Sequence, residues 1–414
     1  MLKIENFFHE KLQRNIVMKK VAKRIYQSFC YVLSDKVRAW GNIERISPND
    51  NFEYFFGYYD KIPWDITDRY ILCLKVKNTY KHPASCEPAE IILIDTVNNS
   101  FETIADTRAW NVQMGCRLQW LGPDFESKII YNDFREGKLC SVIIDLHTKK
   151  ENEICLPIYD VARNGEIAFS LDFIRLNKLR TGYGYININN DKNYVTETCI
   201  YHIDLLKNTK KPILSYDYLK EFVPRKNMIN ATHKVNHIMI NPDGGRIMFL
   251  HRWITKQGKK SRLITMDTEG NKLYNLLDDG MVSHCCWKND NEILTYAYKE
   301  GIGKGYYLLQ DESKKIERIL ISLISDGHPS FSTNGKKIVT DTYPDKERKS
   351  SIYVHENING ITEKIASVYS PFKYDNDVRC DLHPRWNNGS NMVCFDGVFE
   401  GKRALYKINI ESKK

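Results

Sequence analysis

The strongest constraint on the fold is a pattern that recurs seven times along the chain. From about residue 54, each unit has a strand, a tight polar turn, an apolar strand, a loop and a further strand that often ends in Asp. The turns Asp243-Gly244, Asn334-Gly335 and Asn388-Gly389 are strong β-hairpin signals. Residues 51–414 hold seven such units, each of roughly 52 residues. The chain is therefore expected to stack one small supersecondary unit seven times.

The strand after the turn can be assigned in every unit. These strands read Tyr70–Lys75, Lys128–Asn132, Glu166–Ser170, Arg246–Leu250, Glu292–Tyr296, Lys337–Asp341 and Met392–Asp396. A single unit is too small to bury its own apolar surface, whereas units stacked into a ring cover one another. The pattern predicts an all-β fold, a seven-bladed β-propeller.

The seventh unit ends at Lys414 without a fourth strand. An open strand edge exposes unpaired backbone groups and invites aggregation. Ile43-Glu44-Arg45-Ile46 has the alternation of an edge strand, so we expect it to pair with Ala404–Ile408 and close the ring. The predicted organisation is an extension over residues 1–40 and a propeller over residues 41–414.

The extension has a helical pattern. Apolar residues recur at helical spacing from Ile4 to Leu33, with no Gly or Pro between them. The polar side carries Lys19, Lys20, Lys23 and Arg24. This predicts an amphipathic α-helical extension over most of residues 4–38. It could pack on the propeller or a protein partner, or bind an anionic membrane surface.

Charge and cysteine usage restrict the function classes. The net charge is +9, and residues 1–40 supply six of these charges, so a broadly basic nucleic-acid-binding body is excluded. No apolar run is long enough to span a membrane as a helix. The 11 scattered cysteines and the lack of a signal-peptide pattern predict a reducing compartment. We expect a cytoplasmic protein, free or peripheral at the inner membrane face.

One face of the predicted ring collects imidazoles. Aligning the units by their turns places His237, His284, His328 and His383 at the start of four successive first strands, which line the channel of a propeller. A repeated histidine can be a purely structural hydrogen-bonding residue. Alternatively, neutral imidazoles that converge on a funnel suit Zn²⁺ or another transition metal and leave a position open for substrate.

The same face collects cations and further polar groups. The corresponding positions of the first two units are Lys61 and Arg117, and second strands end at His251-Arg252 and Tyr343. Two long insertions, residues 172–198 and 215–236, also fall there. Arginine and lysine beside the histidines suit carboxylates.

The motifs Gly327-His328-Pro329-Ser330-Phe331-Ser332 and His383-Pro384-Arg385-Trp386 resemble the TolB-like and tricorn-type propeller repeat. More narrowly, the chain is similar to propeller polysaccharide lyases, above all oligogalacturonate lyase and more loosely the ulvan lyases. The resemblance implies His284 and His383 as metal ligands, His237 as base and Arg379 as an accompanying arginine. The chain departs from that family at Cys380, where the family has glutamine, and at Arg385, where it has a further histidine ligand. His328 is the candidate substitute.

Two functions remain open at this point. The first is lyase-like β-elimination on a uronic-acid-containing glycan, with a divalent metal (Mn, Zn or Ca) held by His284, His328 and His383. In that function His237 or His251 is the base, Arg379 and Arg385 hold the carboxylate, and Tyr343 is a candidate acid; Lys61, Arg117 and Arg252 bind substrate. The second is a non-catalytic glycan-binding or scaffold propeller in surface-polysaccharide biosynthesis, since similar propellers occur there. Both take an acidic oligo- or polysaccharide as partner.

Overall fold

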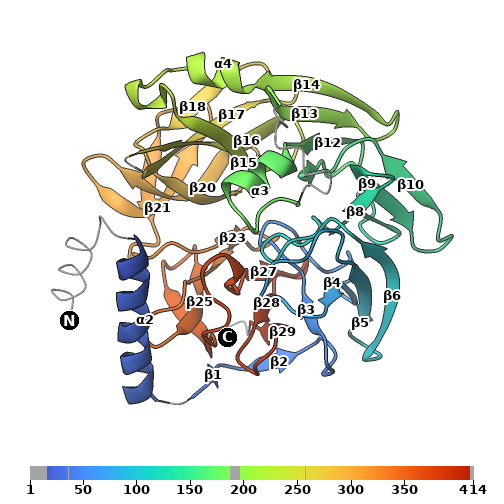
Figure 1. Ribbon diagram of the computed structural model, residues 1–414, viewed down its shortest axis with the longest axis vertical. Helices are drawn as coiled ribbons and strands as arrows, with labels where there is room; N and C mark the ends of the chain where they lie inside the picture. The colour runs from blue at the N-terminus through green and yellow to red at the C-terminus, as the bar shows by residue number, and fades with distance from the viewer. Residues whose placement is uncertain (1–15, 36, 187–195, 257, 411–414) are drawn as a thin grey trace.

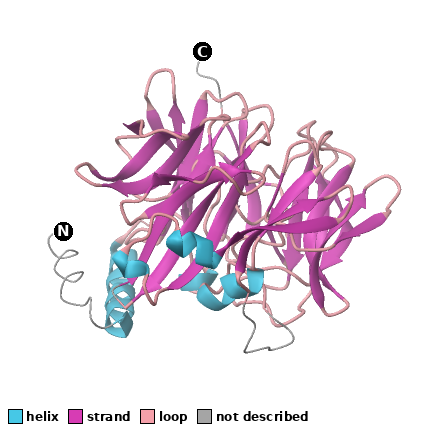
Figure 2. Cartoon of the chain, turned by 90° about the horizontal axis from the view of Figure 1, so that it is seen from above, coloured by secondary structure: helices cyan, strands magenta, loops and turns pink. Residues whose placement is uncertain are grey.

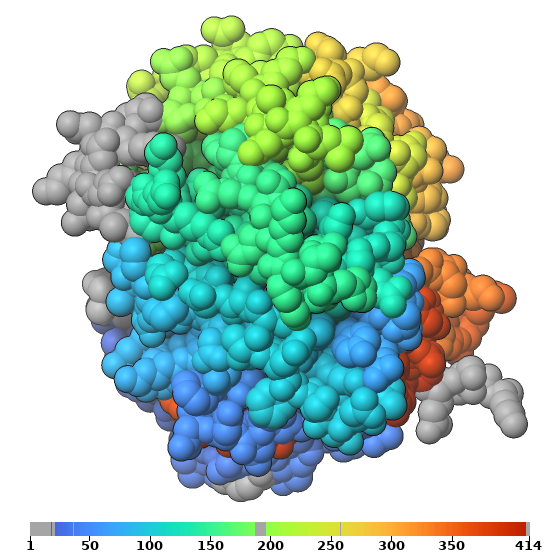
Figure 3. Space-filling model, turned by 90° about the vertical axis from the view of Figure 1, so that its right-hand side faces the viewer, coloured from blue at the N-terminus to red at the C-terminus, as the bar shows by residue number. Residues whose placement is uncertain are grey.

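A computed structural model describes residues 16–35, 37–186, 196–256 and 258–410. Seven antiparallel sheets are arranged as blades around one axis (Figure 1). Seen from the side, consecutive blades follow one another around the ring in chain order, from blue through green to yellow (Figure 3). The predicted seven-bladed β-propeller is confirmed.

The first four blades take their strands in sequence order. Blade 1 contains β3 (Glu53–Phe55), β4 (Tyr70–Val76), β5 (Ala89–Asp95) and β6 (Ser100–Thr107); blade 2 contains β7 (Gln119–Trp120), β8 (Lys128–Arg135), β9 (Lys138–Asp145) and β10 (Glu151–Ile154); blade 3 contains β11 (Asp160–Val161), β12 (Ile167–Ser170), β13 (Thr198–Asp204) and β14 (Thr209–Ser215); blade 4 contains β15 (Thr232–Ile240), β16 (Arg246–Thr255), β17 (Gly258–Asp267) and β18 (Tyr274–Leu277).

The last three blades include the strands that close the ring. Blade 5 contains β19 (Val282–Trp287), β20 (Glu292–Lys299), β21 (Gly303–Gln310) and β22 (Ile316–Ile319); blade 6 contains β23 (Ser330–Phe331), β24 (Lys337–Asp341), β25 (Lys349–Glu356) and β26 (Thr362–Tyr369), with β1 (Ala39–Trp40) at its edge; blade 7 contains β27 (Arg385–Trp386), β28 (Met392–Gly397), β29 (Ala404–Asn409) and β2 (Ile43–Arg45).

The closure is the one that the sequence predicts. Ile43 pairs with Ile408, Glu44 with Lys407 and Arg45 with Tyr406. An N-terminal strand thus completes the C-terminal blade, and the pairing covers an edge of β29 that would otherwise be open. Because β2 and β29 share a sheet, the two ends of the propeller are held together.

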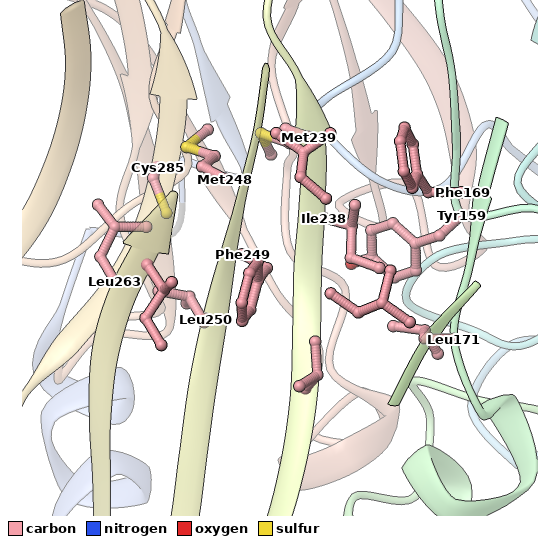
Figure 4. Packing of buried hydrophobic residues seen from close by; sticks show 14 of the residues in the cluster. Tyr159, Phe169, Leu171, Ile238, Met239, Met248, Phe249, Leu250, Leu263 and Cys285 are labelled. Carbon is pink, nitrogen blue, oxygen red and sulfur yellow. The ribbon is translucent and has the colours of Figure 1, made fainter. Parts of the chain in front are cut away.

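Apolar side chains from neighbouring sheets fill the spaces between blades. Between blades 3 and 4, Phe169, Ile238 and Phe249 are fully buried and belong to one cluster (Figure 4). Both faces of an inner strand are covered in a propeller, so β4 and β16 are apolar along most of their length and do not alternate. This packing makes the ring a rigid support for the residues at its centre.

In the described part of the chain, three α-helices accompany the propeller: α2 (Ile16–Leu33), α3 (Phe173–Leu179) and α4 (Tyr216–Glu221). Two short 3₁₀ helices, η1 (Lys226–Met228) and η2 (Asn376–Val378), join them. They gather on one side of the ring (Figure 2). Asp172 caps α3 by accepting a hydrogen bond from the Arg175 amide, and Ser215 caps α4 in the same way. Over the residues described, no helix is long and apolar enough to cross a membrane.

The N-terminal helix α2 lies beside blade 6 (Figure 1). Its polar side faces the propeller: the Gln27 side chain donates to the Asp345 carbonyl at 2.9 Å, and Arg24 forms an ion pair with Asp375 at 3.2 Å. The Tyr31 ring stacks on Tyr369, with 4.9 Å between the centroids. The helix expected over residues 4–38 is confirmed for Ile16–Leu33; residues 1–15 lie outside the described part.

Candidate functional site

The four aligned histidines meet at the centre of the ring. The ring centroids of His284 and His328 lie 4.2 Å apart, those of His328 and His383 4.3 Å, and those of His237 and His284 5.6 Å. All four side chains are buried, with 0–2% of their surface exposed. We call these four residues the histidine ring. The expectation that they share one face is met, but they are covered and do not line an open funnel.

Local backbone irregularities aim these histidines at the axis. The pairing of β15 with β16 shifts between Asn236 and Met239, and that of β19 with β20 shifts between Val282 and Cys285. Such a bulge inserts a residue and redirects its side chain. His237 and His383 also have positive φ angles, 57° and 47°, which non-glycine residues adopt rarely and at some energetic cost. The fold thus holds two of the four histidines in uncommon backbone conformations.

Two tyrosines that sequence reasoning missed complete the centre. The Tyr58 hydroxyl lies 3.0 Å from His237 Nε2 and 3.1 Å from Nδ1, and Tyr59 donates to the Cys285 carbonyl at 2.8 Å. The Tyr59 ring lies 5.3 Å from His328 and 5.8 Å from His284. Alignment of the units by their turns places Lys61 at the channel in blade 1. In the structure, Tyr58, three residues earlier, is the residue that contacts the histidine ring.

Each of three histidines has a fixed partner for its Nδ1 atom. His328 Nδ1 lies 2.8 Å from Asp341 Oδ1, His284 Nδ1 lies 3.0 Å from Asp326 Oδ1, and His383 Nδ1 lies 2.7 Å from the Gly57 carbonyl oxygen. An acceptor at Nδ1 selects the tautomer that carries its proton there and leaves Nε2 with a free lone pair. These second partners are the arrangement expected of metal-binding imidazoles.

The free nitrogens point to a ligand. His328 Nε2 and His383 Nε2 are buried and have no hydrogen-bond partner among the described residues. A buried polar atom without a partner costs free energy and asks for an explanation. Together with a carboxylate oxygen of Asp381, ligand atoms of these two histidines lie within 4.8 Å of one another. Two imidazoles and a carboxylate are a donor set that suits Mn²⁺ or Zn²⁺ better than Ca²⁺, which prefers oxygen ligands.

Asp381 was absent from the predicted ligands. It follows Cys380, where the chain departs from the lyase pattern, and the Cys380 thiol is itself buried beside Tyr374 and Val398. In the sequence, this ligand could have been found from the carboxylate that directly follows Cys380, the position at which the chain departs from the lyase pattern. His284, a predicted ligand, lies next to His328 but outside this group. Its assignment as a metal ligand stays a prediction.

Burial governs protonation at the ring. It lowers the pKa of His237, His284 and His383, so these imidazoles are neutral near pH 7. The charge of Arg252 lowers the pKa of His237 further. His328 differs: against the effect of burial, the Asp341 carboxylate raises its pKa. A neutral, buried imidazole beside a hydroxyl can accept a proton from a substrate.

Three predicted substrate-binding cations are already paired inside the protein. Arg117 makes a bidentate ion pair with Asp60 at 3.0 and 2.7 Å, and Lys61 pairs with Asp160. Arg385 pairs with Asp396 at 3.1 Å and donates to the Tyr58 carbonyl at 3.1 Å. Buried carboxylates thus neutralise these charges, and Arg385 holds the loop that carries Tyr58. Their roles in substrate binding stay predictions.

The remaining predicted residues separate into two places. Arg379 lies 4.4 Å above the Tyr343 ring and pairs with Asp381, and the Tyr343 ring lies 5.7 Å from His328. His251 lies elsewhere, hydrogen-bonded to His233 at 2.9 Å and to Arg262 at 3.1 Å. Successive residues of a strand point to opposite faces, so His251 is turned away while its neighbour Arg252 turns toward His237. This placement disfavours His251 as a base.

No known family model matches the chain, and no curated protein matches it in sequence. Solved structures do match its fold. Oligogalacturonate lyase in complex with manganese matches with a TM-score of 0.66 and 16% identity, over 92% of this chain and 95% of that one. Oligogalacturonate lyase from Vibrio parahaemolyticus matches with a TM-score of 0.62 and 12% identity, over 89% and 94%.

The tricorn protease also matches, with a TM-score of 0.51 and 11% identity, over 89% of this chain and 36% of that one. The fold resemblance to oligogalacturonate lyase and to the tricorn-type propeller is therefore confirmed. At these identities the matches concern the fold alone.

Proposed function

We propose that this chain is a polysaccharide-active propeller that carries out β-elimination on a uronic acid residue of an acidic glycan, with a divalent metal at the histidine ring. One observation carries the proposal. The buried Nε2 atoms of His328 and His383 lie without partners beside Asp381, next to a neutral His237 that contacts the Tyr58 hydroxyl. The fold shared with the manganese-bound oligogalacturonate lyase supports it.

The reaction needs a base, a cation and an acid. The base removes the proton at C5, the electron pair forms the C4–C5 double bond, and the C4–O bond breaks, so that the leaving sugar oxygen takes up a proton. His237 is the base in this proposal, since burial lowers its pKa and keeps the imidazole neutral. The Tyr58 hydroxyl, 3.0 Å from His237 Nε2, orients the imidazole.

The carboxylate of the uronate requires positive charge as the C5 proton leaves, because negative charge then develops on its oxygens. Arg252 and Arg379 are the nearby guanidinium groups; Arg379 has 23% of its side chain exposed, and Arg252 acts on the pKa of His237. His328, His383 and Asp381 would hold the metal, which supplies further positive charge to that carboxylate. Tyr343, beside Arg379 and His328, is the candidate acid.

A second candidate function rests on how fully the site is covered. Tyr58 is 2% exposed, and Tyr183 packs edge-on over it with 6.2 Å between the ring centroids. A sugar reaches the histidine ring only if these side chains move aside. A scaffold or glycan-binding propeller in surface-polysaccharide biosynthesis would not require that movement, and the basic N-terminal segment suits work at a membrane.

Removal of a metal ligand separates a metal site from a structural histidine cluster. We expect purified wild-type protein to bind Mn²⁺ or Zn²⁺ and to gain thermal stability, whereas His383→Ala or Asp381→Asn weakens metal binding by about 100-fold or more, beyond the effect of losing an outer partner. Isothermal titration and elemental analysis measure this. His251→Ala is the matched control, a buried histidine of blade 4. Equal metal binding by all variants would contradict the assignment.

The function itself is tested with a panel of uronate polymers and oligomers. Wild-type protein with Mn²⁺ or Zn²⁺ is expected to produce a 4,5-unsaturated sugar, detected by ultraviolet absorbance and by mass. Binding of an acidic glycan without that product, under every metal, would favour the scaffold function instead.

A further inference from the structure

Beside the histidine ring, blade 4 presents cations that lack carboxylate partners. Lys234 on β15 pairs directly across the sheet with Arg252 on β16, and Arg252 pairs with Ser261 on β17. Lys259 is two residues from Ser261 and so lies on the same face of the blade. Like charges directly opposite each other destabilise a sheet. Lys234 and Arg252 are nonetheless 2% and 4% exposed.

The other buried arginines have the carboxylate partner that Arg252 lacks among the described residues. Arg117, Arg262, Arg348, Arg385 and Arg403 each lie 3.8 Å or less from a carboxylate oxygen. Within the described part of the chain, Arg252 has one acceptor, Asn236 Oδ1 at 2.9 Å, and Lys234 has the Leu179 carbonyl oxygen at 3.4 Å. Burying a cation without a counter-charge costs several kcal/mol by the general estimate. A bound anion would remove that cost.

Further donors lie at the same place without acceptors. The Asn236 Nδ2 atom and the Tyr183 hydroxyl are buried and have no hydrogen-bond partner among the described residues. Arg180, one residue beyond Leu179, places its guanidinium 3.7 Å above the Tyr183 ring. Amide, hydroxyl, ammonium and guanidinium groups are all donors to an oxyanion. The donors of this cluster thus outnumber the acceptors that the described residues offer them, Asn236 Oδ1 and the Leu179 carbonyl oxygen.

The titration of the two lysines agrees with this geometry. Burial and then the charges of Arg180 and Arg252 lower the pKa of Lys234 to about 6. The charge of Arg252, with burial, lowers the pKa of Lys259 to about 7. An anion between them would raise both pKa values, because an opposite charge favours the charged form of a lysine.

We infer that Arg180, Lys234, Arg252 and Lys259, with Asn236 and Tyr183, form a binding subsite for an oxyanion group carrying at least two negative charges. A phosphate monoester and two adjacent carboxylates share this chemistry. That the anion is part of the glycan rests on the proposed function. The substrate would then carry a strongly anionic substituent next to the sugar at the histidine ring. Anion binding itself does not depend on elimination.

The test uses anions alone, without a glycan. Sulfate, inorganic phosphate or digalacturonate is expected to raise the Tm of the full-length protein beyond potassium chloride of equal ionic strength. Lys234→Met and Arg252→Gln should each weaken binding by about 10-fold or more, as for a lost charge-assisted hydrogen bond. Without ligand, Lys234→Met should raise Tm by about 1–3 °C, because it removes a buried amine whose charged form has no counter-charge among the described residues.

Lys260→Met is the matched control, since Lys260 neighbours Lys259 but points to the other face of β17. No anion effect beyond chloride, unchanged affinity in Lys234→Met, or a ligand-free Lys234→Met protein that is less stable than wild type would each overturn the subsite. Sulfate binding without any unsaturated product would leave the subsite standing and remove only the elimination activity.

A separate observation concerns helix α2. Its polar side faces blade 6, and the opposite side carries Val21, Ile25, Phe29 and Leu33 at helical spacing, with 53–70% of each side chain exposed. A contiguous exposed apolar stripe marks an interaction surface. Residues 1–40 carry a net charge of +6, which complements anionic lipid. We propose that this stripe rests on an anionic membrane surface, with the propeller held beside it through Arg24, Gln27 and Tyr31.

Vesicle flotation tests this proposal with the full-length protein. Binding to vesicles that contain phosphatidylglycerol is expected, and Phe29→Asp should reduce the bound fraction by about 10-fold or more, because it places a charge in the apolar stripe. Ile358→Asp is the control, since Ile358 is 95% exposed on blade 6, away from the helix. Absence of binding, binding insensitive to Phe29→Asp, or a dimer that Phe29→Asp dissolves would overturn the lipid assignment.

Discussion

The His237→Asn variant is expected to lose nearly all unsaturated product while keeping the fold of wild type. General-base catalysis contributes about 10²–10⁴-fold to a rate, and His237 is the described imidazole whose ring nitrogens lie within hydrogen-bond distance of the Tyr58 hydroxyl. Asparagine is preferable to alanine here because it tolerates the positive φ of 57° at this position. The initial rate of ultraviolet absorbance increase measures the loss, and circular dichroism checks the fold.

His251→Asn provides the matched comparison. His251 is also a fully buried histidine of blade 4, but it belongs to the hydrogen-bonded chain of His233 and Arg262. Activity within a few-fold of wild type is expected in this variant. Loss of product in His251→Asn together with full activity in His237→Asn would reverse the assignment of the base.

Asp396→Asn is expected to cause the largest loss of stability. The Asp396 carboxylate is fully buried and pairs with Arg385 at 3.1 Å and Arg403 at 2.7 Å, both of which are 1% exposed. Removing one member of a buried ion network leaves uncompensated charge and costs about 3–5 kcal/mol. The same change should disturb Tyr58, because Arg385 holds the Tyr58 carbonyl. Denaturant unfolding measures the free-energy difference.

An exposed ion pair supplies the control for that measurement. Lys211 and Glu269 lie 2.8 Å apart with 61% and 58% of their side chains exposed. Glu269→Gln is expected to cost less than about 1 kcal/mol, since solvent screens such pairs. A loss in Asp396→Asn no greater than in Glu269→Gln would show that the buried network does not hold the centre together.

Much of the fold was predictable because its signals are local. Asp243-Gly244 and Asn334-Gly335 mark turns, and the strands after them begin at Arg246 and Lys337 as expected. Ile43–Arg45 could be assigned to the ring closure because an unfilled edge is a physical problem that the sequence must solve. Strand ends were less predictable: β16 runs on to Thr255 because β17 pairs with it throughout.

The site was predictable only in part. Repeat register brought the four histidines together, since equivalent positions in successive blades converge on the axis. The register could not identify Tyr58, because Tyr58 is not at the position equivalent to the four histidines. Nor could it identify Asp381, which is two residues before the aligned His383. Nor could it show that Arg117 meets Asp60 and that Arg385 meets Asp396. These pairings depend on contacts between segments that no local pattern encodes.

The most direct measurement is the product that purified wild-type protein forms from uronate oligomers in the presence of Mn²⁺ or Zn²⁺. A 4,5-unsaturated sugar, identified by its mass and its ultraviolet absorbance and absent with His237→Asn, is the predicted result. Glycan binding with no unsaturated product for any uronate or metal, or an unsaturated product that persists at the wild-type rate in His237→Asn, would contradict the account.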